Sequence, residues 1–210
     1  MQSSLTVVTP AQSVSLVSLY EAKLALNLQA STDQTTDDQL EMLIEWASAE
    51  IAALCNRTFA KETVIETFSS NEGYFNRAYL SRYPIKNITA VDEDGDALSV
   101  GSDYRVDPAS GLLTRIDSVW AAPMTVSYTG GYDLPNDSPK ALRQAALLMT
   151  RESYNAISRG DSSIRQISHK DSRITYFDPN SKSDSSSSGG GSPARRAVGD
   201  LLKHFTRFWV

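Results

Sequence analysis

Apolar residues recur every three or four positions in three parts of the chain, and this spacing predicts three helices. The clearest stripe runs from Leu40 to Leu54 and predicts a long helix over about residues 36–55. Shorter apolar faces predict helices over about residues 18–28 and 138–156. Between the second and third helices the pattern changes to short runs rich in β-branched and aromatic residues, which are typical of strands.

Two of the predicted helices begin with a capping box. Ser18 with Glu21, and Thr36 with Gln39, have the spacing at which each side chain can bond the backbone N–H of the other residue. The third helix begins with a serine and a proline, which suit the cap and the first helical position. Trp46 lies beside the apolar stripe of its helix, so it belongs either to a second layer of the core or to a subunit contact.

The strand-rich segment, about residues 62–129, predicts a small antiparallel sheet made of hairpins. Asp94-Gly95 is typical of a hairpin turn within it. The expected fold class is therefore α+β, a helical bundle with an inserted antiparallel sheet. We expect residues 1–15 to form an N-terminal arm and residues 16–180 to form the body.

The C-terminal part has a different composition. Residues 181–192 are mostly Ser and Gly, which cannot form a core and predict a flexible tether. Residues 193–210 then predict a basic amphipathic helix at the end of this arm. Four basic side chains and one acidic one give residues 194–210 a net charge of +3, which leaves −8 for the rest of a chain whose total is −5.

This terminal helix has three alternative destinations. It can fold back on its own body, lie on a membrane, or dock on a partner protein. The flexible tether favours a partner protein, because a helix that packs in its own core needs no long flexible connection. Arginine and aromatic residues, which this helix combines, are also enriched at the energetic centres of protein interfaces.

Composition excludes several classes of protein. No apolar run approaches the roughly 20 residues of a membrane span. The first residues lack the basic and apolar regions of a secretory signal. Cys55 is the single cysteine, so an internal disulfide or a cysteine zinc cluster is excluded. The sequence pI of about 5.1 argues against a general nucleic-acid binder.

Patterns that would indicate catalysis or metal binding are incomplete. The alternating aspartates at 92, 94 and 96 lack the glycine that a calcium loop requires, so a hairpin turn is the better interpretation. Residues 160–163 are similar to the surroundings of a nucleophilic serine, but only His169 and His204 could supply the base. We therefore expect no enzymatic activity, no cofactor and no metal.

Several short motifs occur in a definite order along the chain. They are Leu16–Lys23, Thr36–Leu40, Cys55–Phe59, Tyr83–Ile85, Asp103–Asp107, Ser110–Leu113, Val126–Tyr132 and Leu201–Val210. Their order and spacing resemble those of a known family, the head–tail connector (adaptor) proteins of tailed bacteriophages and phage-like particles. The resemblance covers about residues 16–155, and the basic, aromatic end of the chain is also similar to C-termini of that family.

The resemblance implies a structural virion protein at the head–tail junction, assembled in the host cytoplasm. Such proteins form a ring of twelve subunits under the portal, extend the DNA channel and offer a platform to the next neck or tail protein. DNA then passes through the lumen without sequence-specific binding. In several relatives a C-terminal segment grips the portal.

Three sets of candidate residues follow. Trp46 is the candidate subunit contact. The acidic hairpin, with Asp92, Glu93, Asp94 and Asp96, is the candidate channel lining, because a negative wall would not hold phosphates. The expected portal-binding residues are Arg195, Arg196, Leu201, Leu202, Phe205, Arg207, Phe208, Trp209 and Val210.

Two alternatives remain beside the adaptor interpretation. One is a tail-completion or stopper protein of the same neck. The other is an accessory factor of DNA packaging, against whose direct DNA binding the acidity of the body argues.

Overall fold

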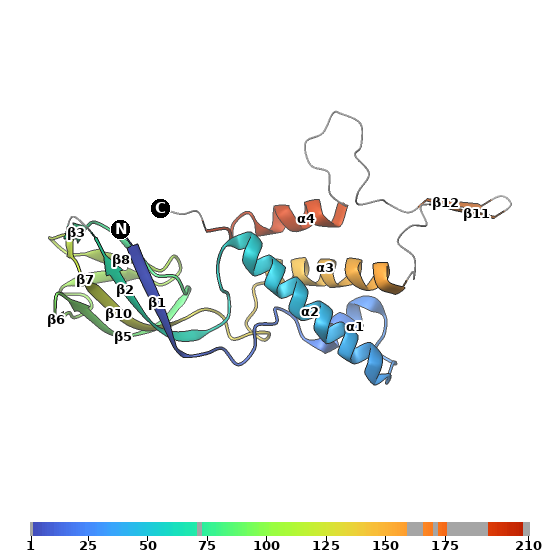
Figure 1. The fold of residues 1–210 in the computed structure, drawn as a ribbon, viewed down its shortest axis with the longest axis horizontal. Helices are drawn as coiled ribbons and strands as arrows, with labels where there is room; N and C mark the ends of the chain where they lie inside the picture. Colours follow the sequence, from blue (N-terminus) through green and yellow to red (C-terminus); the bar gives the residue numbers. More distant parts are fainter. Residues whose placement is uncertain (1, 71–72, 159–165, 170–171, 176–192, 208–210) are drawn as a thin grey trace, which may run out of the picture. The chain divides into compact units, whose positions relative to one another are not determined.

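The computed structural model describes residues 2–70, 73–158, 166–169, 172–175 and 193–207 (Figure 1). The chain forms two compact units. One unit consists of Met1–Val14 and Arg57–Asp137, and the other of Ser15–Asn56 and Ser138–Val210. Strands fill the first unit and helices dominate the second, so the mixed α and β character expected from the sequence is confirmed.

The sheet unit is built around five antiparallel strands in the order β1-β2-β10-β5-β6. The turn between β5 and β6 has positive φ at Asp94 and Gly95, which is the hairpin geometry expected for this pair. The strands of this sheet are β1 (Gln2–Thr9), β2 (Glu62–Ser69), β5 (Ile85–Glu93), β6 (Asp96–Ala97) and β10 (Met124–Gly130).

Two smaller sheets complete this unit. One pairs β3 with β9, and the other has the order β4-β8-β7. The predicted β segment of about residues 62–129 therefore does form antiparallel sheets. The additional strands are β3 (Tyr74–Phe75), β4 (Ala78–Tyr79), β7 (Tyr104–Asp107), β8 (Leu112–Arg115) and β9 (Trp120–Ala121).

The N-terminal residues differ from the sequence expectation of an arm. Gln2 to Thr9 form β1, which pairs antiparallel with β2 along the edge of the five-stranded sheet. Leu5 packs against the core, whereas Val7 and Val8 are largely exposed. Leu5 is the one partly buried side chain of this strand. The strand therefore lacks the alternation of apolar and polar residues by which a half-buried strand is predicted from a sequence.

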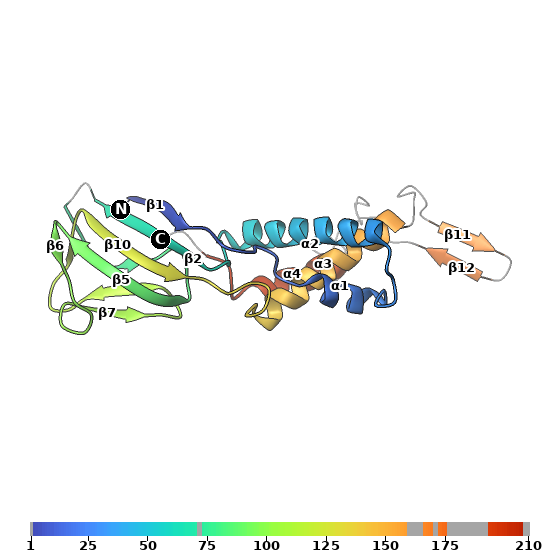
Figure 2. The same ribbon diagram turned by 90° about the horizontal axis from the view of Figure 1, so that it is seen from below.

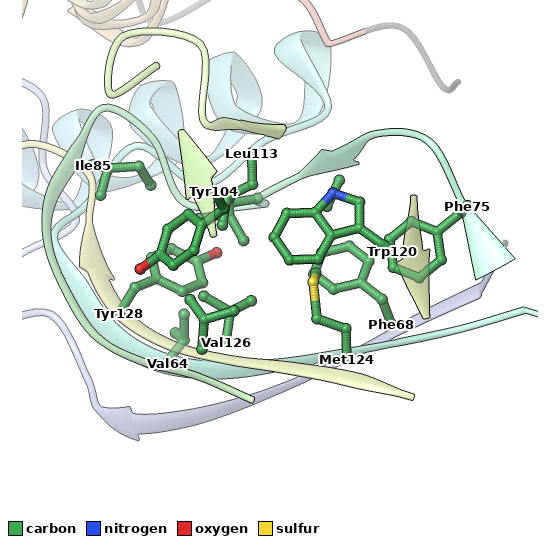
Figure 3. Close-up of a cluster of buried hydrophobic side chains, with 13 residues drawn as sticks. Val64, Phe68, Phe75, Ile85, Tyr104, Leu113, Trp120, Met124, Val126 and Tyr128 are labelled. Atoms are coloured by element: carbon green, nitrogen blue, oxygen red, sulfur yellow. The ribbon is translucent and has the colours of Figure 1, made fainter. Parts of the chain in front are cut away.

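A continuous apolar core lies between the sheets of this unit (Figure 3). Trp120 is fully buried, and its ring lies near those of Phe75 and Tyr104, at centroid distances of 6.5 and 6.1 Å. Aromatic pairs at such distances add to the stabilisation that burial of their surface provides. The core includes Val64, Phe68, Phe75, Ala78, Leu80, Ile85, Val91, Tyr104, Leu113, Trp120, Met124, Val126 and Tyr128.

One carboxylate is fully buried in this apolar core. Glu66 accepts hydrogen bonds from the Ser81 hydroxyl at 2.6 Å, the Ser81 N–H at 2.9 Å and the Tyr128 hydroxyl at 2.7 Å. The Arg82 N–H in turn donates to the Tyr128 oxygen at 3.0 Å. The network joins β2 and β10 to the segment after β4, because each buried polar group must find a partner there.

This network predicts a loss of stability in alkaline solution. Burial, and secondly the charge of Glu66, raises the pKa of Tyr128 well above its ordinary value of 10.0. Above about pH 10 the unfolded tyrosine loses its proton while the folded one keeps it, so the free energy of unfolding falls as pH rises, by up to about 1.4 kcal/mol per pH unit. Urea unfolding between pH 9 and 11 should show a shallower fall for Tyr128→Phe. Equal slopes for the two proteins would contradict this.

Among the residues that the structure describes, the helical unit has four helices, which pack on one another (Figure 2). α2 and α3 contact each other, α1 packs on both, and α4 packs on α3. Their bounds are α1 (Leu19–Leu26), α2 (Gln34–Cys55), α3 (Lys140–Ser158) and α4 (Pro193–Leu202). A two-stranded hairpin, β11 (Gln166–His169) and β12 (Ser172–Thr175), also belongs to the described residues.

The helix termini confirm one expected cap and correct two. The capping box of Ser18 and Glu21 is present at α1. α2 begins two residues earlier than expected, because the Asp33 carboxylate, rather than Thr36, accepts the first free N–H groups, those of Thr35 and Thr36. Ser138 does not cap α3, because its buried hydroxyl has no hydrogen-bond partner among the described residues.

Candidate partner-binding surfaces

The described part of the C-terminal segment lies on the helical unit of its own chain. α4 runs beside α3, as Figure 1 and Figure 2 show. Val198 and Leu202 are only 3% and 4% exposed, and Leu201 is half-buried. Burying two such side chains stabilises the docked helix by about 3–6 kcal/mol in total, which a ten-residue helix needs because it is marginal alone.

The residues after α4 continue along the same unit. The Phe205 N–H donates to the Leu202 carbonyl at 2.8 Å, and the Arg207 N–H donates to the Cys55 carbonyl at 2.9 Å. The second bond satisfies a carbonyl at the end of α2, where the helix leaves such groups without intrahelical partners. The described C-terminal segment is thus fixed to α2 as well as to α3.

In this structure the terminal helix folds back on its own body, the first of the three alternatives considered for it. Its apolar side chains Val198 and Leu202 face the chain's own helices, while docking on a partner stays a prediction. The sequence shows that these side chains require burial, but it does not show which surface covers them. The expected contacts at Phe208, Trp209 and Val210, and the tether at 181–192, lie outside the described residues.

The basic residues of this segment face outward. Arg195 and Arg196 are exposed near the start of α4. Lys203 is also exposed and pairs with Asp200 at 2.7 Å, one turn earlier. An ion pair so open to solvent contributes little to stability, so the bond to Asp200 does not hold Lys203 in place. Docking of the apolar face leaves the basic face of α4 as its accessible surface.

Trp46 lies on the exposed side of α2. Its side chain is 46% exposed, and Met42, one turn earlier, is 58% exposed. Of the two roles considered for Trp46, the structure excludes a place in a buried second core layer within the described chain. A tryptophan left this open is typical of a contact with another molecule.

The acidic hairpin divides into two parts. The Glu93 carboxylate accepts bonds from the Arg115 guanidinium at 2.9 Å and from the Ala121 N–H at 2.8 Å, so it holds the sheet unit together. Asp92 is half-buried, whereas Asp94 and Asp96 at the turn are exposed. The surface charge of this hairpin therefore comes mainly from Asp94 and Asp96.

Within the residues that the structure describes, no group of three or more His, Cys, Asp or Glu side chains could hold a metal ion. Nor is any helix of that part of the chain long and apolar enough to cross a membrane. Cys55 is fully buried at the end of α2. Residues 160–163 lie outside the described part.

Two features were not anticipated from the sequence. One is the outward face of α3, where Lys140, Gln144 and Arg151 are exposed. The buried apolar stripe of α3 lies on the opposite side of the helix. The other is Glu66, which stands in the inward register between Val64 and Phe68. A charged residue at an inward strand position is the signal that could have revealed it.

The comparisons with known proteins agree with this architecture. The chain has the fold of proteins in gene transfer agent (GTA) particles. One structure is the neck of an empty GTA particle computed with C6 symmetry, with a TM-score of 0.58, 15% identity, and 99% of this chain and 97% of that chain covered. A chain of the native GTA virion gives a TM-score of 0.59 at 14% identity, with 98% of this chain and 96% of that chain covered.

A third structure, the neck of the native particle computed with C12 symmetry, gives a TM-score of 0.55 at 14% identity, with 99% and 97% of the two chains covered. No curated protein matches the chain. The model of one family, described as head completion protein, matches residues 16–160, which is more than half of the chain. The resemblance to head–tail connectors is thereby confirmed, and the chain belongs to the head completion protein family.

Proposed function

We propose that this protein is a head–tail adaptor that forms a ring between the portal and the neck or tail of a virion and extends the DNA channel. The observation that carries the proposal is the family match over residues 16–160. Similarity of fold over nearly the whole chain to proteins of GTA necks, computed with C6 and C12 symmetry, supports it. The C12 symmetry used for one of these necks favours a ring of twelve copies. Head-to-tail contacts would close such a ring.

The C-terminal segment is the proposed contact with the portal. Arg195 and Arg196 would pair with acidic groups at the portal rim, and Phe205 and Arg207 with the residues after them would continue the contact. The exposed position of the two arginines supports this role. Leu202 would contribute only if α4 left α3, because its side chain is buried in the chain's own helical unit.

The turn of the acidic hairpin is the proposed channel surface. Asp94 and Asp96 are exposed, and negative side chains repel the phosphates of passing DNA rather than retaining them. Asp94→Lys with Asp96→Lys should slow the ejection of DNA from completed particles, measured as the fraction released with time. Ejection at the wild-type rate would contradict a place in the channel.

Direct portal binding distinguishes the adaptor from a stopper. The full-length chain should bind portal-bearing, DNA-filled heads that lack all other neck proteins, whereas a stopper would need the adaptor to be present first. Arg195→Glu with Arg196→Glu should weaken this binding about tenfold or more, since arginine contacts dominate many interfaces. Sedimentation of heads with labelled protein measures both. Binding only after another neck protein is added would favour the stopper.

A further inference from the structure

The outer face of α2 carries an apolar seam that the described part of its own chain leaves open. Met42, Trp46, Ala49 and Ala53 are all exposed, and they follow one another at intervals of four, three and four residues. This is the spacing at which one helix packs along another. The two large side chains could anchor a partner helix, while the two alanines let its backbone approach closely.

Acidic residues border this seam. Asp38, Glu41 and Glu45 are exposed and lie three and four residues apart, so they face one another along the helix. Like charges at these spacings destabilise a helix by a few tenths of a kcal/mol per pair. Glu41 and Glu45 make no ion pair with any described residue, and residues 33–55 contain no basic side chain. A cationic partner would relieve this repulsion.

The outer face of α3 has the complementary character. Lys140, Gln144, Leu147 and Arg151 follow one another at the same intervals of four, three and four residues. Leu147 is half-buried and the other three are exposed. Neither Lys140 nor Arg151 forms an ion pair within the described chain, and no acidic residue belongs to this row. The opposite face of α3 supplies the core residues Leu142, Ala145, Ala146 and Met149.

We propose that these two surfaces join neighbouring copies of this chain: the outer face of α2 of one copy docks on the outer face of α3 of the next. The inference rests on the proposed ring and names the contact that builds it. Opposite charge and matching spacing select a second copy, and they select a head-to-tail arrangement. A contact between two α2 faces would bring acidic side chains together and is disfavoured. A contact between the α2 face of one copy and the α3 face of the next can repeat from copy to copy until the ring closes.

Charge reversal tests this arrangement. The acid-reversed variant carries Glu41→Lys and Glu45→Lys, and the base-reversed variant carries Lys140→Glu and Arg151→Glu. Each alone should lose self-association, because like charges then meet at every contact. An equal mixture should regain it, since each reversed face meets the reversed face of the other variant, and rings would alternate the two. Mass photometry of the full-length proteins over a concentration series, with and without purified portal, measures this.

Matched variants separate this contact from the portal contact. Arg195→Glu with Arg196→Glu changes charge as much as the base-reversed variant does and lies on α4, so it should leave self-association intact. Trp46→Ala should weaken self-association about tenfold or more while circular dichroism stays unchanged. Reversed variants that associate like the wild type, or a mixture no better than either variant, would overturn the contact alone. A wild-type chain that stays monomeric throughout both series would overturn the ring itself and the contact with it.

Discussion

Glu66→Ala should destabilise the sheet unit by about 3 kcal/mol or more. The substitution removes the acceptor of three hydrogen bonds inside an apolar core and leaves the Ser81 N–H and hydroxyl and the Tyr128 hydroxyl to find other partners. Hydrogen bonds to a carboxylate are stronger than neutral ones, and a buried donor without a partner costs about 1–3 kcal/mol. Urea unfolding followed by tryptophan fluorescence measures the loss, since Trp120 is buried in the same core.

Two control variants isolate the network. Ile65→Ala changes the neighbouring residue of β2, which points to the opposite face and is 38% exposed, so it should cost less than about 1 kcal/mol. Tyr128→Phe removes one donor to Glu66 and should cost about 1–2 kcal/mol. Because the two groups touch, the double variant should lose less than the sum of the single losses. Additive losses, or a Glu66→Ala protein as stable as Ile65→Ala, would show that the carboxylate does not organise this core.

Leu202→Asp should release α4 from the helical unit. The substitution places a carboxylate in a site that is 4% exposed, and burying an unpaired charge costs more than the roughly 3 kcal/mol that one leucine contributes. Because α4 is too short to persist alone, its backbone amides should lose protection from hydrogen exchange by about a hundredfold or more. Hydrogen-exchange mass spectrometry of residues 194–204 measures this directly.

Ala197→Asp is the matched control, because it introduces the same group on the exposed side of the same helix. It should leave exchange in α4 close to that of the wild type. If both variants exchange alike, α4 is not held by its buried leucine. The same variant can be tested for binding to portal-bearing heads. A change in binding by Leu202→Asp would show that the docked position of α4 matters for the portal contact.

The expectations that came true rest on local chemistry. The Ser18 capping box and the Asp94-Gly95 turn depend on residues within a few positions of each other, so the sequence is enough to predict them. The start of α2 is also a local feature, but the sequence alone does not predict it, because Asp33 and Thr36 both suit a cap. Asp33 prevails through bonds from two backbone N–H groups and the Thr36 hydroxyl.

The partly successful expectations concern surfaces. Periodicity placed Trp46 off the apolar stripe, and the structure then shows that its side chain is exposed. The sequence also places Glu93 in the acidic hairpin with the surface aspartates. In the structure its carboxylate accepts a hydrogen bond from Arg115, 22 residues away. The charge pattern of a hairpin is visible in the sequence. Which of its charged side chains stay exposed depends on residues from distant strands that bond to the others.

The sequence by itself determined the helices, the hairpin turns and the amphipathic character of the terminal segment, because each depends on spacing along a few turns or strands. Only the tertiary structure decided that β1 completes the sheet, that Glu66 finds Tyr128 across 62 residues, and that α4 covers α3. The physical reason is common to all three. An apolar face or a buried polar group requires a partner, and any surface of suitable shape and chemistry can supply it. The packing of the whole chain therefore decides which surface becomes that partner.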